Sequence, residues 1–244
     1  MEADQRIADS PRRKRRWFQF SLRMLFVFTL VCAVSSAWVA RRMEQKRKEK
    51  EAVVELEKLG GHIMYDAKPF GPDWLRKFLG ENFFSEANQL LFDRDETKVT
   101  DARLANLKRL TKLQFLRFAS TNVTDAGLEN LTGLTELQSL YLDETNVADA
   151  GLEHVKGLTQ LQWLPLEGTK VTDAGLVNLK ALTKLQTLVL SRTGITDAGL
   201  EQLDDLTRLR ELNLDGTKIT DAGMVHLAGM KQLQDLNLDF TRHQ

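Results

Sequence analysis

The sequence predicts an α/β solenoid behind an N-terminal transmembrane helix, with parallel strands on the concave side and short helices on the convex side. Two observations predict this fold class. From Leu113 onward the chain repeats with a period of 24 residues, and each unit joins an L-x-x-L-x-L segment to a D-A-G-L-x-x-L segment. Near the N-terminus, residues 24–40 carry no charge and are followed by Arg41 and Arg42. Units this short cannot bury a core alone and must stack on their neighbours.

The charge of the chain is divided unevenly between its two ends. The formal net charge of the 244 residues is zero, but residues 1–50 have a balance of +8 and residues 51–244 a balance of −8. A basic head is typical of a segment that orients a chain at a membrane, whereas an acidic body disfavours nucleic acid as a partner. Cys32 is the one cysteine, which excludes an internal disulfide.

Residues 1–17 are predicted to be a basic tail and residues 18–40 one transmembrane helix. The uncharged part would be about 25 Å long as a helix, and the residues before it extend the span towards the ~30 Å of a bilayer core. Arg23 can reach back to the headgroups through its long side chain. Trp17 and Trp38 lie near the two ends, where indole rings favour the membrane interface.

The alternatives to an uncleaved anchor are a cleaved signal peptide and a lipoprotein signal. Small residues at 35–37 would suit cleavage of a signal peptide, but Arg41 and Arg42 would then follow the cut almost directly. The residues before Cys32 are too large for a lipoprotein signal, so Cys32 is expected to be an apolar filler. Seven Lys/Arg precede the uncharged run and six follow within 41–50, which slightly favours a cytoplasmic N-terminus with the repeats outside.

Residues 41–60 are predicted to form a helical stalk, because they are rich in helix-forming residues and oppositely charged neighbours. Residues 61–87 are predicted to be an N-terminal cap, with a strand at 62–65, a loop at 69–72 and a helix whose N-cap is Asp73. The aromatic residues of the predicted cap helix and of the segment after it are Trp74, Phe78, Phe83 and Phe84. We expect them to cover the open apolar end of the repeat stack rather than to line a ligand pocket.

Residues 88–244 hold the repeats. In L-x-x-L-x-L alternate side chains point inward, as in a strand, and in A-G-L-x-x-L-x-x-L a spacing of three suits a short helix with one buried stripe. An incomplete unit comes first, and its matching columns hold Phe92, Thr97, Val99, Asp101 and Leu104. The period and pattern resemble those of the leucine-rich repeat family. The resemblance implies parallel strands, helices on the outer side and binding through the concave face.

The most regular part of each unit is T-D-A-G-L, which spans residues 124–128 in the first complete unit. We expect Thr124 to be a helix N-cap that accepts a hydrogen bond from a backbone N–H of the first turn. Asp125 would complement the positive end of the same helix. Ala126 and Gly127 are small and permit close packing between repeats. Ala148 replaces this threonine in the following unit, which predicts a weaker cap there.

Two polar columns run through the repeats. One consists of Asp101, Asp125, Asp149, Asp173, Asp197 and Asp221. A calcium site needs several oxygen ligands that converge from different chain positions, so one acid per repeat favours a structural role and no metal. The other consists of Thr121, Thr145, Thr169, Thr193, Thr217 and Thr241. It occupies positions where the family often has Asn, and its side chains are expected to bond the backbone of the neighbouring turn.

The concave face is expected to hold the residues that bind a partner. An apolar and aromatic patch consists of Phe115, Tyr141, Trp163, Pro165 and Val189, with Arg117 among them. An acidic patch consists of Glu211, Asp215, Asp235 and Asp239, joined along one edge by Asp143 and Glu167. Exposed aromatic residues are typical interface anchors, and the acids would favour a basic protein or peptide. The alternative is that these are ordinary surface residues.

The sequence favours a binding protein over an enzyme. It contains no H-E-x-x-H, no phosphate-binding glycine loop and no G-x-S-x-G, and its histidines are scattered, so no cofactor is expected. The basic head, the W-F-x-F-S-L-R segment at 17–23 and the apolar run resemble single-span, membrane-anchored bacterial leucine-rich repeat proteins.

Two alternative functions stay open. The T-D-A-G-L repeats also resemble those of F-box-type ubiquitin-ligase adaptors, which would be soluble, although no F-box-like helical domain precedes the repeats here. The other alternative is a structural envelope protein that self-associates through the open edge of its C-terminal strand.

Overall fold

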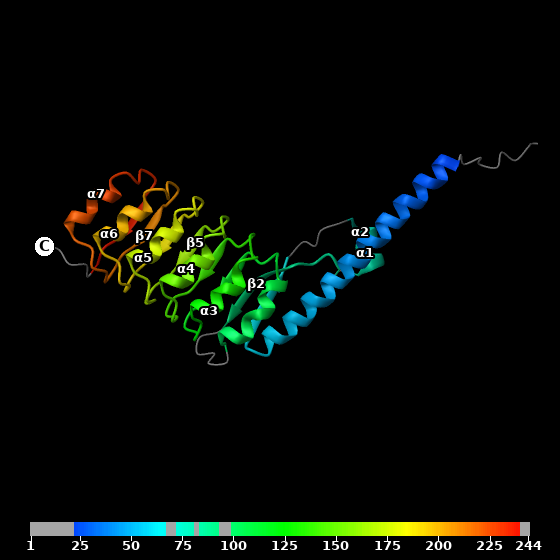
Figure 1. Cartoon of the computed structure of the whole chain (residues 1–244), viewed down its shortest axis with the longest axis horizontal. Coiled ribbons are helices and arrows are strands. Elements are labelled where there is room, and N and C mark those ends of the chain that lie inside the picture. Colours follow the sequence, from blue (N-terminus) through cyan, green and yellow to red (C-terminus); the bar gives the residue numbers. More distant parts are fainter. Residues whose placement is uncertain (1–21, 67–71, 81–82, 93–98, 240–244) are drawn as a thin grey trace, which may run out of the picture. The chain divides into compact units, whose positions relative to one another are not determined.

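The computed structural model describes residues 22–66, 72–80, 83–92 and 99–239 (Figure 1). The predicted basic tail, the loop residues 69–71, Thr97 and Thr241 lie outside the described residues. The chain divides into two compact units, of which one ends at Glu44 and the other, from Gln45 onward, carries the repeats.

The helix α1 (Leu22–Glu57) contains both the uncharged run and most of the predicted stalk. Its side chains from Met24 to Trp38 are exposed. Among the described helices, α1 alone is long and apolar enough to cross a membrane, a property that single-pass anchors and signal sequences share.

The C-terminal part of α1 belongs to the repeat-bearing unit. Ala52, Val53 and Leu56, together with Leu59 just beyond the helix, are buried in the same apolar cluster as the repeat leucines. An apolar stripe on an otherwise charged helix packs in this way against a neighbouring layer. This part of the predicted stalk therefore completes the hydrophobic core at the N-terminal end of the repeats.

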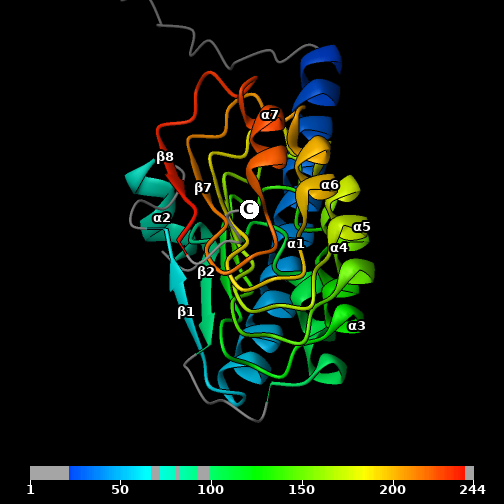
Figure 2. The same ribbon diagram turned by 90° about the vertical axis from the view of Figure 1, so that its left-hand side faces the viewer.

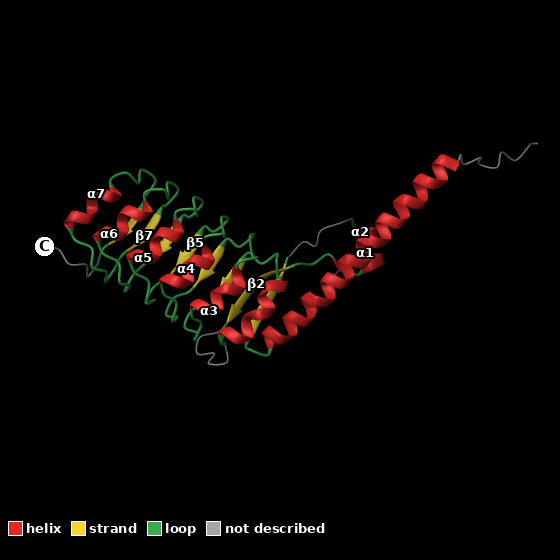
Figure 3. Ribbon diagram, in the orientation of Figure 1, coloured by secondary structure: helices red, strands yellow, loops and turns green. Residues whose placement is uncertain are grey.

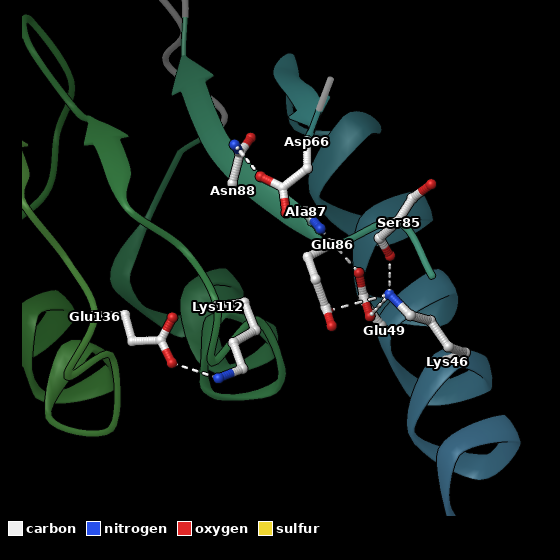
Figure 4. A network of polar contacts seen from close by, with 9 residues as sticks. All are labelled: Lys46, Glu49, Asp66, Ser85, Glu86, Ala87, Asn88, Lys112 and Glu136. Atoms are coloured by element: carbon white, nitrogen blue, oxygen red, sulfur yellow. Dashed lines mark hydrogen bonds and ion pairs between the residues drawn. The ribbon is translucent and has the colours of Figure 1, made fainter. Parts of the chain in front are cut away.

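Polar contacts fasten the same part of α1 to the start of the sheet (Figure 4). Lys46 Nζ lies 2.7 Å from Glu49 and 3.2 Å from Glu86, and it also donates to the carbonyl oxygen of Ser85. The Glu49 carboxylate accepts the backbone N–H of Ala87 at 3.1 Å. Because these groups are partly buried, their hydrogen bonds contribute more than an exposed ion pair would.

Within the described residues, eight strands form one sheet in chain order, and Figure 2 shows the strands and the repeat helices on opposite sides. The strands are β1 (Gly61–Tyr65), β2 (Ala87–Phe92), β3 (Phe115–Arg117), β4 (Ser139–Tyr141), β5 (Trp163–Pro165), β6 (Thr187–Val189), β7 (Glu211–Asn213) and β8 (Asp235–Asn237). β1 is antiparallel to β2, and every later pair is parallel. Phe115 pairs with Ser139, one period of 24 residues later, which confirms the predicted solenoid.

Short helical segments return the chain on the other side of the repeats (Figure 3). The α-helices are α3 (Asp125–Leu128), α4 (Asp149–Val155), α5 (Asp173–Leu176), α6 (Asp197–Leu200) and α7 (Met224–Leu227). The 3₁₀ helices are η2 (Asp101–Arg109), η3 (Glu129–Leu131), η4 (Val177–Leu179), η5 (Glu201–Leu203) and η6 (Asp221–Gly223). Columns of leucine between the two sides form one continuous core, so each repeat is buried by its neighbours.

The prediction that the cap aromatics cover the end of the stack is wrong for one helix. In α2 (Asp73–Leu79) no residue is buried, and Trp74 and Phe78 are 70% and 81% exposed. Pro72 occupies the N-cap position that was predicted for Asp73. Phe83 and Phe84 are buried, and their rings lie against each other with centroids 4.9 Å apart. The pattern of α2 is amphipathic, but the sequence could not show that α1 already supplies apolar cover at this end.

The repeated aspartate joins each repeat to the next. In four of the joints, one carboxylate oxygen accepts the backbone N–H of the next repeat's threonine, and the other accepts its hydroxyl at 2.6 Å. These pairs are Asp101–Thr124, Asp149–Thr172, Asp173–Thr196 and Asp197–Thr220. In the remaining joint, Asp125 accepts only the N–H of Ala148, at 2.6 Å. The structural role predicted for the aspartates is confirmed, but their bonds run between repeats.

The predicted N-caps are mostly wrong. Thr124, Thr172 and Thr196 occupy the N-cap position but make no side-chain cap bond. Their hydroxyls instead donate to the preceding repeat's carboxylate, a charged acceptor that forms a stronger bond than a neutral one. Thr220 differs because its hydroxyl also accepts the N–H of Ala222, at 3.3 Å.

The second threonine column also bonds differently from the prediction. The hydroxyl of Thr121 donates at 2.6 Å to the carbonyl of Phe118, three residues earlier in its own repeat. Thr145, Thr169, Thr193 and Thr217 repeat this bond. These side chains are buried, and the bond satisfies the hydroxyl within its own repeat.

The glycine of T-D-A-G-L has to be small because the aspartate of the preceding repeat lies against it. A Cβ on Gly175 would lie 2.5 Å from Asp149 Oδ1, and one on Gly199 would lie 2.3 Å from Asp173 Oδ1. No side chain larger than hydrogen fits there without displacing the carboxylate. Threonine, aspartate and glycine of the motif thus form one joint, which we call the Asp–Thr joint.

The incomplete joint at Ala148 provides a direct test. Ala148→Thr would add the missing hydroxyl bond to Asp125 and is expected to raise the free energy of unfolding by about 1 kcal/mol. Ala148→Val is the matched control, because it adds a side chain of similar shape without the hydroxyl. Urea unfolding of the repeats, followed by Trp163 fluorescence, measures both. Equal stability of the two variants would contradict the role of the hydroxyl.

Candidate functional site

The strands β3 to β8 present alternate residues on the concave face. In β3 to β7 the middle leucine of each strand is buried. The residues on either side of it therefore point to the opposite face of the sheet. This places the candidates from the third and fifth positions of each repeat on one continuous surface, as predicted.

An aromatic patch covers the N-terminal part of this surface. The rings of Phe115 and Tyr141, from neighbouring strands, lie 5.1 Å apart with an interplanar angle of 36°. Trp163 on β5 pairs in register with Ser139 on β4, the strand that also carries Tyr141, and it is 37% exposed. Such partly exposed rings offer rigid apolar area to a partner at a low cost in conformational entropy.

A charged hollow of about 360 Å³ lies beside the aromatic patch. Its lining residues are Arg117, Ala119, Ser120, Asp143, Glu144, Pro165, Glu167, Val189 and Arg192. The structure thus brings together five of the predicted residues around one concavity, which we call the charged hollow. Pro165 is buried, and Val189 is half-buried.

Ion pairs cross the mouth of the charged hollow. One guanidinium nitrogen of Arg192 lies 2.5 Å from Glu167 and 3.3 Å from Glu144. The Ser120 hydroxyl donates to Glu144 at 3.0 Å. Glu144 and Arg192 are exposed, whereas Ser120 and Glu167 are half-buried. Ion pairs this open to solvent contribute little to stability. A charged ligand can therefore exchange with them at a low cost.

Three residues of the charged hollow adopt a backbone conformation that favours glycine. Ser120, Glu144 and Arg192 have φ values of 61°, 55° and 55°. Gly168 and Gly216 occupy the same position in two other repeats, each with φ of 64°. A side chain in the left-handed region costs roughly 1–2 kcal/mol, and strain of this kind is concentrated at functional sites. Each of the three described residues of this column that carry a side chain lines the charged hollow.

The carboxyl of Asp143 lies within the charged hollow in an unfavourable environment. Burial raises its pKa above the ordinary value, and the negative charge of Glu167 raises it further. A hydrogen bond from the Glu167 N–H, at 3.3 Å, and the charge of Arg117 act in the opposite direction. A cationic group placed here would stabilise the ionised form of Asp143.

The predicted acidic patch lies further along the sheet and does not line the charged hollow. Glu211 on β7 is exposed and accepts the hydroxyl of Thr187 at 3.0 Å. Asp235 and Asp239 are exposed, and Asp215 is half-buried. Their separation from Asp143 and Glu167 divides the predicted acids into two groups.

Ser120, Glu144 and Arg192 line the charged hollow but were not among the candidates predicted from the sequence. They occupy the eighth position of the repeat, whereas the candidates were taken from the third, fifth and seventh. The sequence does contain a signal for this position, because glycine alternates with charged residues at Glu144, Gly168, Arg192 and Gly216. Among the described residues, no group of three or more His, Cys, Asp or Glu side chains is arranged to hold a metal ion.

The strain at the eighth position predicts a gain in stability when a side chain is removed. Arg192→Gly is expected to raise the free energy of unfolding by about 0.5–1 kcal/mol, because relief of the left-handed strain exceeds the entropy cost of glycine. Gly168→Ala, the reverse change at the same position, is expected to lower it by about 1 kcal/mol. Chemical unfolding measures both, and a destabilised Arg192→Gly variant would show that Arg192 serves the fold.

Comparisons with known proteins agree with this architecture. The family model described as "Leucine-rich repeat region" matches residues 90–244. No curated protein matches the chain in sequence. Among solved structures, internalin C2 from Listeria monocytogenes matches with 28% identity, 58% of each chain covered and a TM-score of 0.50. The chain therefore spans little more than half of internalin C2.

Two further structures match with lower scores. The match to the internalin inlF from the same organism has 20% identity and a TM-score of 0.42, and it covers 65% of this chain and 56% of the inlF chain. The plant peptide hormone receptor RGFR1 in complex with RGF2 has 17% identity, covers 60% and 23%, and has a TM-score of 0.43. Because the family model matches well over half of the residues, the chain belongs to the leucine-rich repeat family.

Proposed function

We propose that the chain is a non-catalytic recognition protein, anchored in a membrane, that binds a protein or peptide on the concave face of its repeats. Proteins of the leucine-rich repeat family are typically binding proteins rather than enzymes, and stacked repeats create extended concave surfaces for this purpose. The observation that carries the proposal is the aromatic patch next to the charged hollow. In that hollow, Glu144 and Arg192 occupy left-handed positions at which two other repeats have glycine.

The proposed ligand carries a basic group beside an apolar one. Asp143, Glu144 and Glu167 place three carboxylates around the charged hollow against the guanidinium groups of Arg117 and Arg192. The aromatic patch would receive the apolar group, and the acids on β7 and β8 would attract a basic partner over a longer range. Since a cation favours ionised Asp143, binding is expected to weaken as the pH falls through the pKa of that carboxyl.

Anchoring through residues 18–40 is the second part of the proposal. It is supported by the exposed apolar surface of α1 and by the flanking basic residues. The excess of Lys/Arg before the uncharged run supports a cytoplasmic N-terminus with the repeats on the other side. Self-association through the edge strand β8 stays a proposal, which the like charges of exposed Asp235 and Asp239 oppose.

Selection from a random peptide display library tests the binding proposal. The probe is the full chain in detergent micelles, and the selected peptides are expected to be rich in Lys or Arg next to apolar residues. Tyr141→Ala combined with Trp163→Ala should weaken their binding at least tenfold, which corresponds to about 1.4 kcal/mol or more. Fluorescence anisotropy of a labelled selected peptide provides the measurement.

Val177→Ala is the matched control, because Val177 is exposed on the helical side of the repeats. It should bind the peptides as the unchanged chain does. Equal binding by the Tyr141, Trp163 double variant would reject the aromatic patch as the binding surface. Selected peptides without any enrichment in Lys or Arg would reject the basic ligand.

A further inference from the structure

The helix α2 presents two large aromatic side chains to the outside of the molecule. Trp74 and Phe78 are four residues apart and therefore lie on the same helix face. Trp74 is 70% exposed and Phe78 is 81% exposed. Lys77, which precedes Phe78, is exposed as well. The exposed valines of the repeat helices, Val177 and Val225, stand singly and need no explanation. Adjacent Trp and Phe on one short helix form an apolar patch that needs a partner.

The patch belongs to the segment that connects β1 to β2. This segment leaves the sheet and returns to it beside Lys46 of α1. Figure 2 shows α2 beyond the end of β1. The segment leaves the sheet after Asp66, whose N–H bonds to the carbonyl of Glu86 at 3.1 Å, where the segment returns. Lys46 of α1 bonds at the same place to Ser85 and Glu86. Lys46 follows Arg42 by only four residues in the chain, so the residue that holds the ends of this segment comes soon after the uncharged run in the sequence.

We infer that α2 is a second membrane contact, with Trp74 and Phe78 inserted at the interface between headgroups and acyl chains. The inference rests on the proposed anchoring, because that anchor brings the lipid surface to the root of this segment. Indole and phenyl rings favour the interface, and the exposed ammonium of Lys77 suits anionic headgroups. With α1 as the first contact, α2 needs little affinity of its own, since the anchor holds it at a high effective concentration near the lipid.

Quenching of single tryptophans by brominated lipids tests this inference. The full chain is reconstituted into phosphatidylcholine and phosphatidylglycerol vesicles whose lipids are brominated near the top of the acyl chains. Three variants each keep one of Trp38, Trp74 and Trp163, with the other tryptophans changed to phenylalanine. We expect strong quenching and blue-shifted emission for Trp74, several-fold greater quenching than for Trp163, and a loss of the blue shift with Phe78→Ser. Val177→Ser is the control for a change of equal polarity elsewhere.

The Trp38 variant separates the inference from the anchoring on which it rests. If the lipids quench Trp38 but not Trp74, the inference is overturned and the anchor stays intact. The same holds if Trp74 emission is blue-shifted without quenching, because a protein surface rather than lipid would then cover it. Absence of quenching at both residues would overturn the anchor and the inference together. Equal quenching of Trp163 would show non-specific adsorption and would also overturn the inference.

Discussion

The bond between the aspartate of one repeat and the threonine of the next is the interaction on which the rest of the structure depends. Each repeat is too short to bury its leucines alone, so it is stable only while its neighbours stay in register. The carboxylate of Asp173 fixes that register at the start of the helical segment, with one oxygen on the N–H and the other on the hydroxyl of Thr196. Gly199 leaves the space that the carboxylate occupies. The buried leucines supply most of the free energy, and the Asp–Thr joint determines which residues face each other.

A fixed register frees the other positions of the repeat to vary. The motif that forms the joint changes little from unit to unit, whereas the third, fifth, seventh and eighth positions differ in nearly every repeat. Those positions form the aromatic patch and the charged hollow. The left-handed residue Arg192 shows this most clearly, because its repeat tolerates strain there while the joint between Asp173 and Thr196 stays intact. Regular positions thus serve the scaffold, and the proposed binding surface consists of variable positions.

Much of the fold could be predicted from the sequence because a 24-residue period is a strong constraint. The parallel strands, the short helices and the structural role of the aspartates follow from it. The bonding partners do not, because a period cannot distinguish a bond within a repeat from one between repeats, and Thr124 was for that reason assigned to its own helix. The alternation of the strands was enough to predict Tyr141 and Trp163 on the concave face. Side chains at the eighth position face the charged hollow because of a positive φ angle, which the repeat pattern does not reveal. The exposure of Trp74 and Phe78 was not predicted, because the apolar spacing of α2 is the same for a helix that packs on the repeats as for one that does not.

A double-mutant cycle on one joint tests the central claim most directly. Asp173→Ala, Thr196→Val and the combined variant are each unfolded in urea, and their free energies of unfolding are compared with that of the unchanged chain. If the carboxylate binds the threonine of the next repeat, the combined loss should be smaller than the sum of the single losses by about 1 kcal/mol. Additive losses, within about 0.3 kcal/mol, would show that the two residues act separately and would contradict the account.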